Sequence, residues 1–252
     1  MASCCPATAW PALQAPADYN PRGESITLGS DLPAYTMSPP AGVSATGGGV
    51  IVLPEVFGFS GRLRGICDTL ADEGFHVIML DCHRGSTVAD GPDIKTWVGK
   101  YPYESVVEPD LNAAIAWLKT EKGAAKVGCV AFCWGVWAAC KASSCGVEFA
   151  CCVGCHPSTK LENFAFDRSE VEMMKLVKAP LCLMPAGDDP DVIKPGGEIA
   201  DHLLSAGDNQ VVVFDEMRHG WVSRGDLGDA TVKRDVEKAT TLMLIFLKKY
   251  IV

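Results

Sequence analysis

The feature of this sequence that most constrains its fold is a series of short apolar runs separated by helix-length segments. Runs at 50–55, 75–81, 126–132 and 180–186 are predominantly apolar, with apolar residues in succession, which is typical of strands buried on both faces. Further strands are expected at 149–155 and 210–216, with a hairpin over 24–37. Helices are predicted over 61–73, 108–122, 134–143, 167–178, 195–206 and 229–249. The alternation predicts an α/β fold with a mostly parallel sheet covered by helices on both faces.

The composition is that of a globular protein, and we expect one domain over residues 1–252. The chain is 48% hydrophobic and 21% charged, which suffices for a sizeable core. Its net charge of −9 argues against nucleic acid or an anionic membrane as partner. The N-terminus lacks the basic and apolar regions of a secretory signal, and no apolar stretch is long enough to cross a membrane. We therefore expect a cytoplasmic monomer that acts on a small molecule.

The sequence contains 12 cysteines, many of them within the apolar runs. Buried, reduced cysteines that act as small hydrophobes are the default interpretation. One group could be read as metal ligands, namely Cys151, Cys152, Cys155 and His156. It has no paired second half, and the run CCVGC has the pattern of a buried strand, so we do not predict a zinc site there.

Cys133 differs from the other cysteines because it stands between an expected strand and an expected helix. It lies within the pattern AFCWG (131–135), with small residues two positions before and after it. A sharp strand-to-helix turn needs such residues, and it would project the thiol beyond the carboxyl end of the sheet. The helix N-terminus would favour the thiolate, and the N–H of Trp134 would face a developing oxyanion. A buried structural cysteine remains the alternative.

A thiol nucleophile needs a base and a group that orients the base. Of the histidines after Cys133, His202 lies on an expected amphipathic helix and His156 could be structural. His219 follows the last expected strand in MRHGWVSRGD, where a catalytic histidine is expected. The acid should follow the strand 180–186, where AGDDPD offers three aspartates: Asp188, Asp189 and Asp191.

These motifs together resemble the dienelactone hydrolases (carboxymethylenebutenolidases) of the α/β-hydrolase fold, in particular a eukaryotic branch of that family. The resemblance rests on PEVFGF (54–59), LDCHRG (80–85), AFCWG (131–135), the AGDD turn and HGWVSRGD (219–226). Ala131 stands where the family has glycine, and Val136 where a second glycine is common. Segment 82–103 is expected to form a lid or loop.

The resemblance implies a role for each site residue. Cys133 would be the nucleophile, His219 the general base and acid, and Asp189 the orienting acid, with Asp188 and Asp191 as second and third choices. Glu55 would hydrogen-bond the resting thiol, and a carboxylate so placed would disfavour a second negative charge. The remaining implied roles are an oxyanion hole from the amides of Val56 and Trp134, substrate-carboxylate binding by Arg84 and Arg224, and a pocket lined by Phe57 and Trp221. No metal or organic cofactor is implied.

The sequence thus predicts a cysteine hydrolase of an ester, lactone or thioester that forms an acyl-enzyme. Two alternatives remain open. Glu55 and Asp189 could serve as the paired carboxylates of a glycan-acting hydrolase. A non-catalytic α/β-hydrolase scaffold could instead act as a binding protein or as a thiol sensor.

Overall fold

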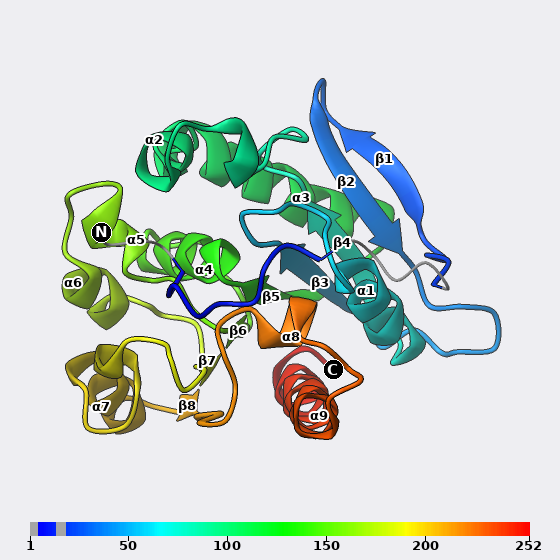
Figure 1. Cartoon of the computed structure of the whole chain (residues 1–252). Helices are drawn as coiled ribbons and strands as arrows, with labels where there is room; N and C mark the ends of the chain where they lie inside the picture. Colours follow the sequence, from blue (N-terminus) through cyan, green and yellow to red (C-terminus); the bar gives the residue numbers. More distant parts are fainter. Residues whose placement is uncertain (1–4, 14–18) are drawn as a thin grey trace.

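The computed structural model describes residues 5–13 and 19–252. The strands among them form one eight-stranded sheet (Figure 1). Residues 1–4 and 14–18, part of the N-terminal stretch expected to lack a secretory signal, lie outside the described residues. The strand order is β1-β2-β4-β3-β5-β6-β7-β8. The strands are β1 (Glu24–Leu28), β2 (Leu32–Met37), β3 (Gly48–Leu53), β4 (His76–Leu80), β5 (Lys126–Phe132), β6 (Cys152–Cys155), β7 (Leu181–Met184) and β8 (Gln210–Val211).

Strands β3 to β8 run parallel, whereas β2 pairs antiparallel with both β1 and β4. The expected hairpin is therefore β1 and β2, and Gly29 in its turn has a φ of 56°, a conformation that glycine adopts without steric cost. The mostly parallel sheet predicted from the apolar runs is confirmed. Its parallel strands share one carboxyl edge, so the loops that follow them meet there.

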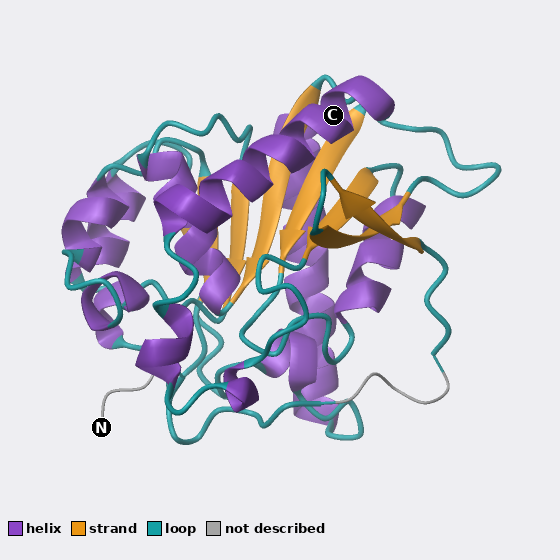
Figure 2. Cartoon of the chain, turned by 90° about the horizontal axis from the view of Figure 1, so that it is seen from above, coloured by secondary structure: helices purple, strands orange, loops and turns teal. Residues whose placement is uncertain are grey.

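Helices cover both faces of the sheet (Figure 2). They are α1 (Leu63–Asp72), α2 (Ile94–Val98), α3 (Glu108–Glu121), α4 (Trp134–Ser144), α5 (Leu161–Phe164), α6 (Glu170–Lys175), α7 (Glu198–Ser205), α8 (Trp221–Arg224) and α9 (Ala230–Ile251). Alternate residues of β3 divide the core. Ile51 and Leu53 belong to the cluster that includes α3 and α4, whereas Val50 and Val52 belong to the cluster that includes α1 and α9. Each such buried side chain stabilises the fold by about 1.5–3 kcal/mol.

Several elements differ in extent from the predictions. The run 149–155 forms a strand only from Cys152, and the run 210–216 only over Gln210–Val211. The second run lies at the sheet edge, where one neighbouring strand supplies ladder hydrogen bonds, and only a single bridge between Ala186 and Phe214 continues the pairing. Segment 82–103 contains α2, whose N-cap Asp93 accepts a hydrogen bond from the Thr96 amide at 2.9 Å. Helices as short as α2, α5 and α8 span too few turns for periodicity to reveal them.

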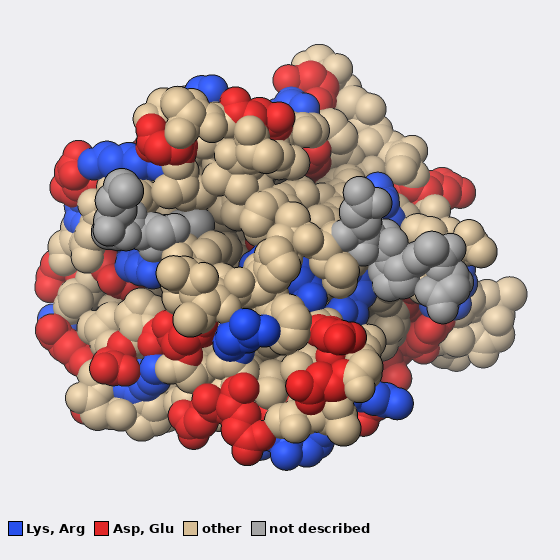
Figure 3. Space-filling view, viewed as in Figure 1, with Lys and Arg blue, Asp and Glu red and all other residues tan. Residues whose placement is uncertain are grey.

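Acidic and basic side chains are interspersed around the rim of the face shown in Figure 3. Among the described residues, no helix combines the length and the apolar character that a membrane span requires.

Candidate active site

Cys133 lies at a strained turn between β5 and α4. Its φ of 51° and ψ of −111° are rare for a residue that carries a side chain. The residue two positions after Cys133 must be small, because a Cβ there would overlap the carbonyl oxygen of Leu53 on β3. Gly135 meets this requirement. The turn thus packs closely against the neighbouring strand and holds the buried Cys133 thiol at the carboxyl edge of the sheet.

His219 and Asp189 reach the same edge from the loops after β8 and β7. The distance from His219 Nδ1 to Asp189 Oδ1 is 2.6 Å, and both side chains are buried. Asp189 is itself fixed, since its Oδ2 accepts a hydrogen bond from the Ala186 amide at 2.8 Å. This arrangement leaves the Nε2 atom of His219 on the side of the ring away from Asp189.

The three aspartates of the AGDD turn have different surroundings, which the sequence could not separate. Asp188 Oδ1 accepts a hydrogen bond from the His219 backbone N–H at 2.6 Å, and its Oδ2 accepts one from Thr8 Oγ1 at 2.5 Å. The Asp191 side chain is fully exposed. Of the three, Asp189 contacts the His219 ring, and Asp188 hydrogen-bonds the backbone N–H of the same histidine.

The two buried histidines at this edge have opposite electrostatics. Burial alone lowers the pKa of His219, but the negative charges of Cys133 and Asp189 outweigh it and raise this pKa to about 10. For His156, burial and the neighbouring His219 both act to lower the pKa. The two rings meet edge to face, with centroids 5.1 Å apart. At neutral pH the arrangement therefore favours a protonated His219 beside a neutral His156.

The surroundings of the Cys133 sulfur include groups that the sequence analysis did not assign to the site. Ser158 Oγ lies 3.3 Å from Cys133 Sγ, and Cys5 Sγ lies 3.6 Å from it. Within the described part of the chain, no hydrogen bond engages the N–H groups of Val56 or Trp134. Both amides thus remain available as donors, as the predicted oxyanion hole requires.

Glu55 is buried two residues beyond the end of β3, but its hydrogen bonding differs from the prediction. Its Oε2 accepts a hydrogen bond from Arg224 Nε at 2.8 Å rather than from the Cys133 thiol. A guanidinium is the stronger donor, which explains the exchange of partner. Burial raises the pKa of Glu55, the positive charge of Arg224 lowers it and the charge at Cys133 raises it, so that the pKa is raised overall. Glu55 and Cys133 therefore do disfavour each other's negative charge.

The predicted substrate-binding residues lie in three different surroundings. Arg224 lies beside Glu55, over the Phe57 ring at 4.9 Å, and its buried Nη2 has no hydrogen-bond partner among the described residues. Trp221 is packed in the core against Phe214, with ring centroids 4.4 Å apart. Arg84 is held by an ion pair with Asp110, in which Nη2 and Oδ1 are 2.8 Å apart, and by a longer one with Asp31. A substrate anion would have to compete with Asp110 for Arg84.

The N-terminal segment 5–13 covers this site. The Trp10 amide donates to the His219 carbonyl oxygen at 2.9 Å, and the Trp10 carbonyl oxygen accepts from Arg224. The Trp10 ring stacks under the Arg218 guanidinium at 4.2 Å. A hollow of about 670 Å³ adjoins Arg224 between residues 10–13 and 225–228. No sequence signal places this segment, because its contacts are set by the tertiary fold.

Within the described residues, Cys151 and the two cysteines of β6 do not converge with His156 on a metal site. Among the described residues, one group brings three potential metal-ligand atoms together. It consists of Cys5, Cys133 and His219. Burial raises the pKa values of Cys151 and Cys155, as expected of cysteines that act as core residues.

The chain is similar to known proteins over most of its length. The family model described as "Dienelactone hydrolase family" matches residues 32–251. A Salmonella typhi protein, provisionally named a carboxymethylenebutenolidase, is 36% identical over 113 residues, and that match covers 42% of this chain and 41% of the Salmonella protein. A carboxymethylenebutenolidase homolog of Xenopus tropicalis is 25% identical over 244 residues, or 93% of each chain.

Solved structures show the same fold. A dienelactone hydrolase-like promiscuous phosphotriesterase, P91 from metagenomic libraries, superposes with a TM-score of 0.68 at 20% identity over 97% of this chain and 100% of that one. The expected α/β-hydrolase fold is thus confirmed. The chain belongs to the dienelactone hydrolase family.

Proposed function

We propose that this protein hydrolyses a small ester, lactone or thioester through an acyl-enzyme on Cys133. The observation that carries the proposal is the convergence of Cys133, at a strained strand-to-helix turn, with a His219 ring that is hydrogen-bonded to Asp189. A thiol, an imidazole and a carboxylate in this order are the parts that nucleophilic acyl transfer needs.

In the first half of the reaction, the imidazolium of His219 stabilises the thiolate of Cys133, which attacks the carbonyl carbon of the substrate. The carbonyl oxygen becomes an oxyanion, and the N–H groups of Val56 and Trp134 would hydrogen-bond it. When the tetrahedral species collapses, the bond to the leaving oxygen or sulfur breaks. His219 then gives its Nε2 proton to the leaving group, so that an acyl-Cys133 and a neutral imidazole remain.

In the second half, the neutral His219 removes a proton from a water molecule, and the resulting hydroxide attacks the acyl-Cys133 carbonyl. The carbon–sulfur bond breaks, the acid leaves, and the thiolate–imidazolium pair returns. Asp189 holds the Nδ1–H tautomer throughout and stabilises the positive ring each time it forms.

An anionic substrate would find its partner at Arg224 rather than at Arg84. Arg224 Nη2 is a buried donor with no hydrogen-bond partner within the described residues, and it adjoins the 670 Å³ hollow. Cys133 and His219 are both buried beneath segment 5–13, so the substrate reaches them only after that segment moves. Displacing the Trp10 carbonyl from Arg224 would give the guanidinium a further donor for a carboxylate.

The glycan-acting alternative has little support in the geometry. A glycosidase needs two carboxylates that face the sugar across one pocket. Here Asp189 is hydrogen-bonded to His219, and Glu55 is paired with Arg224. Neither carboxylate is available as a general acid without breaking a buried ion pair.

The test is intact-mass spectrometry of the reduced protein after mixing with p-nitrophenyl acetate. The wild type should gain one acetyl group, which peptide mapping assigns to Cys133, and should release p-nitrophenol with turnover. The Cys133→Ala variant should show neither, whereas a Cys145→Ala control, which changes an exposed cysteine, should behave as wild type. No adduct and no product with a panel of esters, lactones and thioesters would favour the non-catalytic scaffold or thiol sensor instead.

A further inference from the structure

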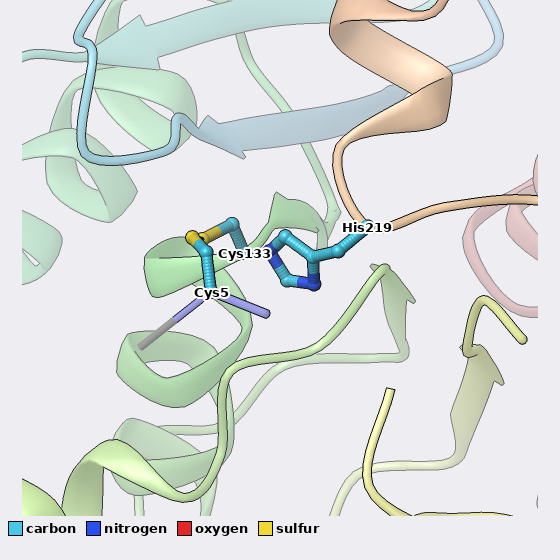
Figure 4. A group of neighbouring side chains, drawn as sticks. All are labelled: Cys5, Cys133 and His219. Atoms are coloured by element: carbon cyan, nitrogen blue, oxygen red, sulfur yellow. The ribbon is translucent and has the colours of Figure 1, made fainter. Parts of the chain in front are cut away.

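Three potential metal ligands converge above the catalytic turn, and they come from three separate parts of the chain. Cys5 belongs to the N-terminal segment, Cys133 to the β5–α4 turn and His219 to the loop after β8 (Figure 4). Their ligand atoms lie within 4.8 Å of one another, and the two sulfur atoms are 3.6 Å apart. The catalytic mechanism uses Cys133 and His219 but gives no role to Cys5.

The spacing matches what a tetrahedral metal ion imposes on its ligands. With a zinc–sulfur bond of about 2.3 Å and tetrahedral angles, two thiolates on one ion lie about 3.8 Å apart. The observed 3.6 Å is close to that distance, whereas a disulfide requires the two sulfur atoms to lie about 2.05 Å apart. Three protein ligands with a fourth position open is an arrangement that zinc adopts with two cysteines and one histidine.

The surroundings of His219 also suit it to bind a metal ion. His219 Nε2 is buried and has no hydrogen-bond partner within the described part of the chain beyond its interaction with Cys133. Its other ring nitrogen is hydrogen-bonded to Asp189 at 2.6 Å. A carboxylate behind a histidine in this way fixes the ring orientation and strengthens the histidine as a metal ligand.

We propose that Cys5, Cys133 and His219 form a binding site for a soft divalent d10 ion, with Zn²⁺ as the representative. The ion accepts the Sγ atoms of both cysteines as thiolates and Nε2 of a neutral His219. Two protons leave for water, one from the Cys5 thiol and one from the Cys133–His219 pair. The two thiolates then balance the charge of the ion, which a buried site requires.

The bound ion would switch the hydrolase off, an effect that rests on the proposed function. It would occupy the nucleophile and the base at once and tie segment 5–13 over the site. That segment is already held by the Trp10 amide on the His219 carbonyl and by Thr8 on Asp188. The ion would add a bond at the end of the segment where Cys5 lies, so substrate entry and metal binding would exclude each other.

The whole chain of residues 1–252 is first stripped of metal and reduced with a phosphine. Its Zn²⁺ uptake is then measured by competition with a chromogenic chelator. Co²⁺ uptake is followed through its thiolate charge-transfer absorption. Wild type and Cys145→Ala should bind one ion per chain and lose p-nitrophenyl acetate hydrolysis as it binds, with recovery on adding EDTA. Cys5→Ala should bind Zn²⁺ at least about a hundredfold more weakly, and its ester hydrolysis should resist Zn²⁺ in the same proportion.

Two results would overturn the proposal: no ion bound by the reduced wild type, or equal binding by wild type and Cys5→Ala. A Cys5–Cys133 disulfide would appear as a loss of two mass units before reduction. If reducing that disulfide then produces no metal site, the proposal is overturned. Because uptake is measured without substrate, an inactive protein that binds Zn²⁺ through these residues would defeat the proposed function and leave the metal site standing.

Discussion

Cys133 and Cys155 lie side by side at the carboxyl edge of the same sheet, yet their surroundings differ in almost every respect. Cys155 is the last residue of β6 and pairs with Phe132, the residue before Cys133. The Cys133 amide donates to the Cys155 carbonyl oxygen at 3.2 Å. Cys155 ends its strand in regular extended backbone and packs into the core with Cys182, whereas Cys133 leaves its strand at a φ of 51°.

The difference teaches that the backbone turn and the charged neighbours, rather than burial, distinguish the thiol proposed as the nucleophile from a structural one. Both thiols are buried. Burial and the nearby Cys182 raise the pKa of Cys155 well above its usual value, which keeps it neutral. Cys133 instead faces the His219 imidazolium, whose own pKa is raised by the charge at Cys133. The two groups therefore favour each other's charged forms.

The largest expected contrast is chemical reactivity. In the folded, reduced and metal-free protein at pH 7, iodoacetamide should alkylate Cys133 at least about a thousandfold faster than Cys155, because only a thiolate reacts. Opening of segment 5–13 should suffice for Cys133, whereas Cys155 needs the sheet core to open. Peptide mass spectrometry over time gives both rates in one sample. Comparable rates for the two residues would remove the distinction drawn here.

The next contrast separates the two neighbouring aspartates. Asp189→Asn should lower kcat/KM for p-nitrophenyl acetate by about a hundredfold to ten-thousandfold, because the amide removes the charge that orients and stabilises the His219 ring. Asp188→Asn should cost less than about tenfold, since its side-chain oxygen can still accept from the His219 backbone N–H. The reverse order would make Asp188 the orienting acid.

The pH profile tests the charge state of His219. A raised pKa means that the ring keeps its proton to higher pH, so kcat/KM should stay level through neutral pH. It should fall by on the order of tenfold per unit only above about pH 10, where the ring becomes neutral. Rates are corrected for spontaneous ester hydrolysis at each pH. In Asp189→Asn the fall in kcat/KM should begin at lower pH, because Asp189 is one cause of the raised pKa of His219. If kcat/KM of the wild type instead falls around pH 6.5, the proposed Cys133–His219 ion pair is contradicted.

The sequence was sufficient for those features that depend on local pattern. The apolar runs predict the sheet, and AFCWG predicts a turn whose Gly135 the structure explains by its contact with Leu53. What the sequence could not provide depends on tertiary contacts. Asp188 and Asp189 are chemically identical neighbours, and only the path of the loop after β8 decides which carboxylate meets the His219 ring. The Glu55–Arg224 pair and the position of Cys5 join residues more than 100 positions apart, which no local pattern encodes.

The smallest expected effect is on stability. Cys155→Ala removes one sulfur atom from a packed core and should lower the free energy of unfolding by about 1 kcal/mol, since the small cavity forfeits contacts without exposing a polar group. Ester hydrolysis should be unchanged, because the Cys155 side chain lies in the core cluster with Cys182 and only its backbone carbonyl contacts Cys133. Urea unfolding followed by circular dichroism gives the first quantity and steady-state kinetics the second. A large loss of activity at unchanged stability would mean that Cys155 supports the catalytic turn through its side chain, and the contrast between the two cysteines would then be one of degree.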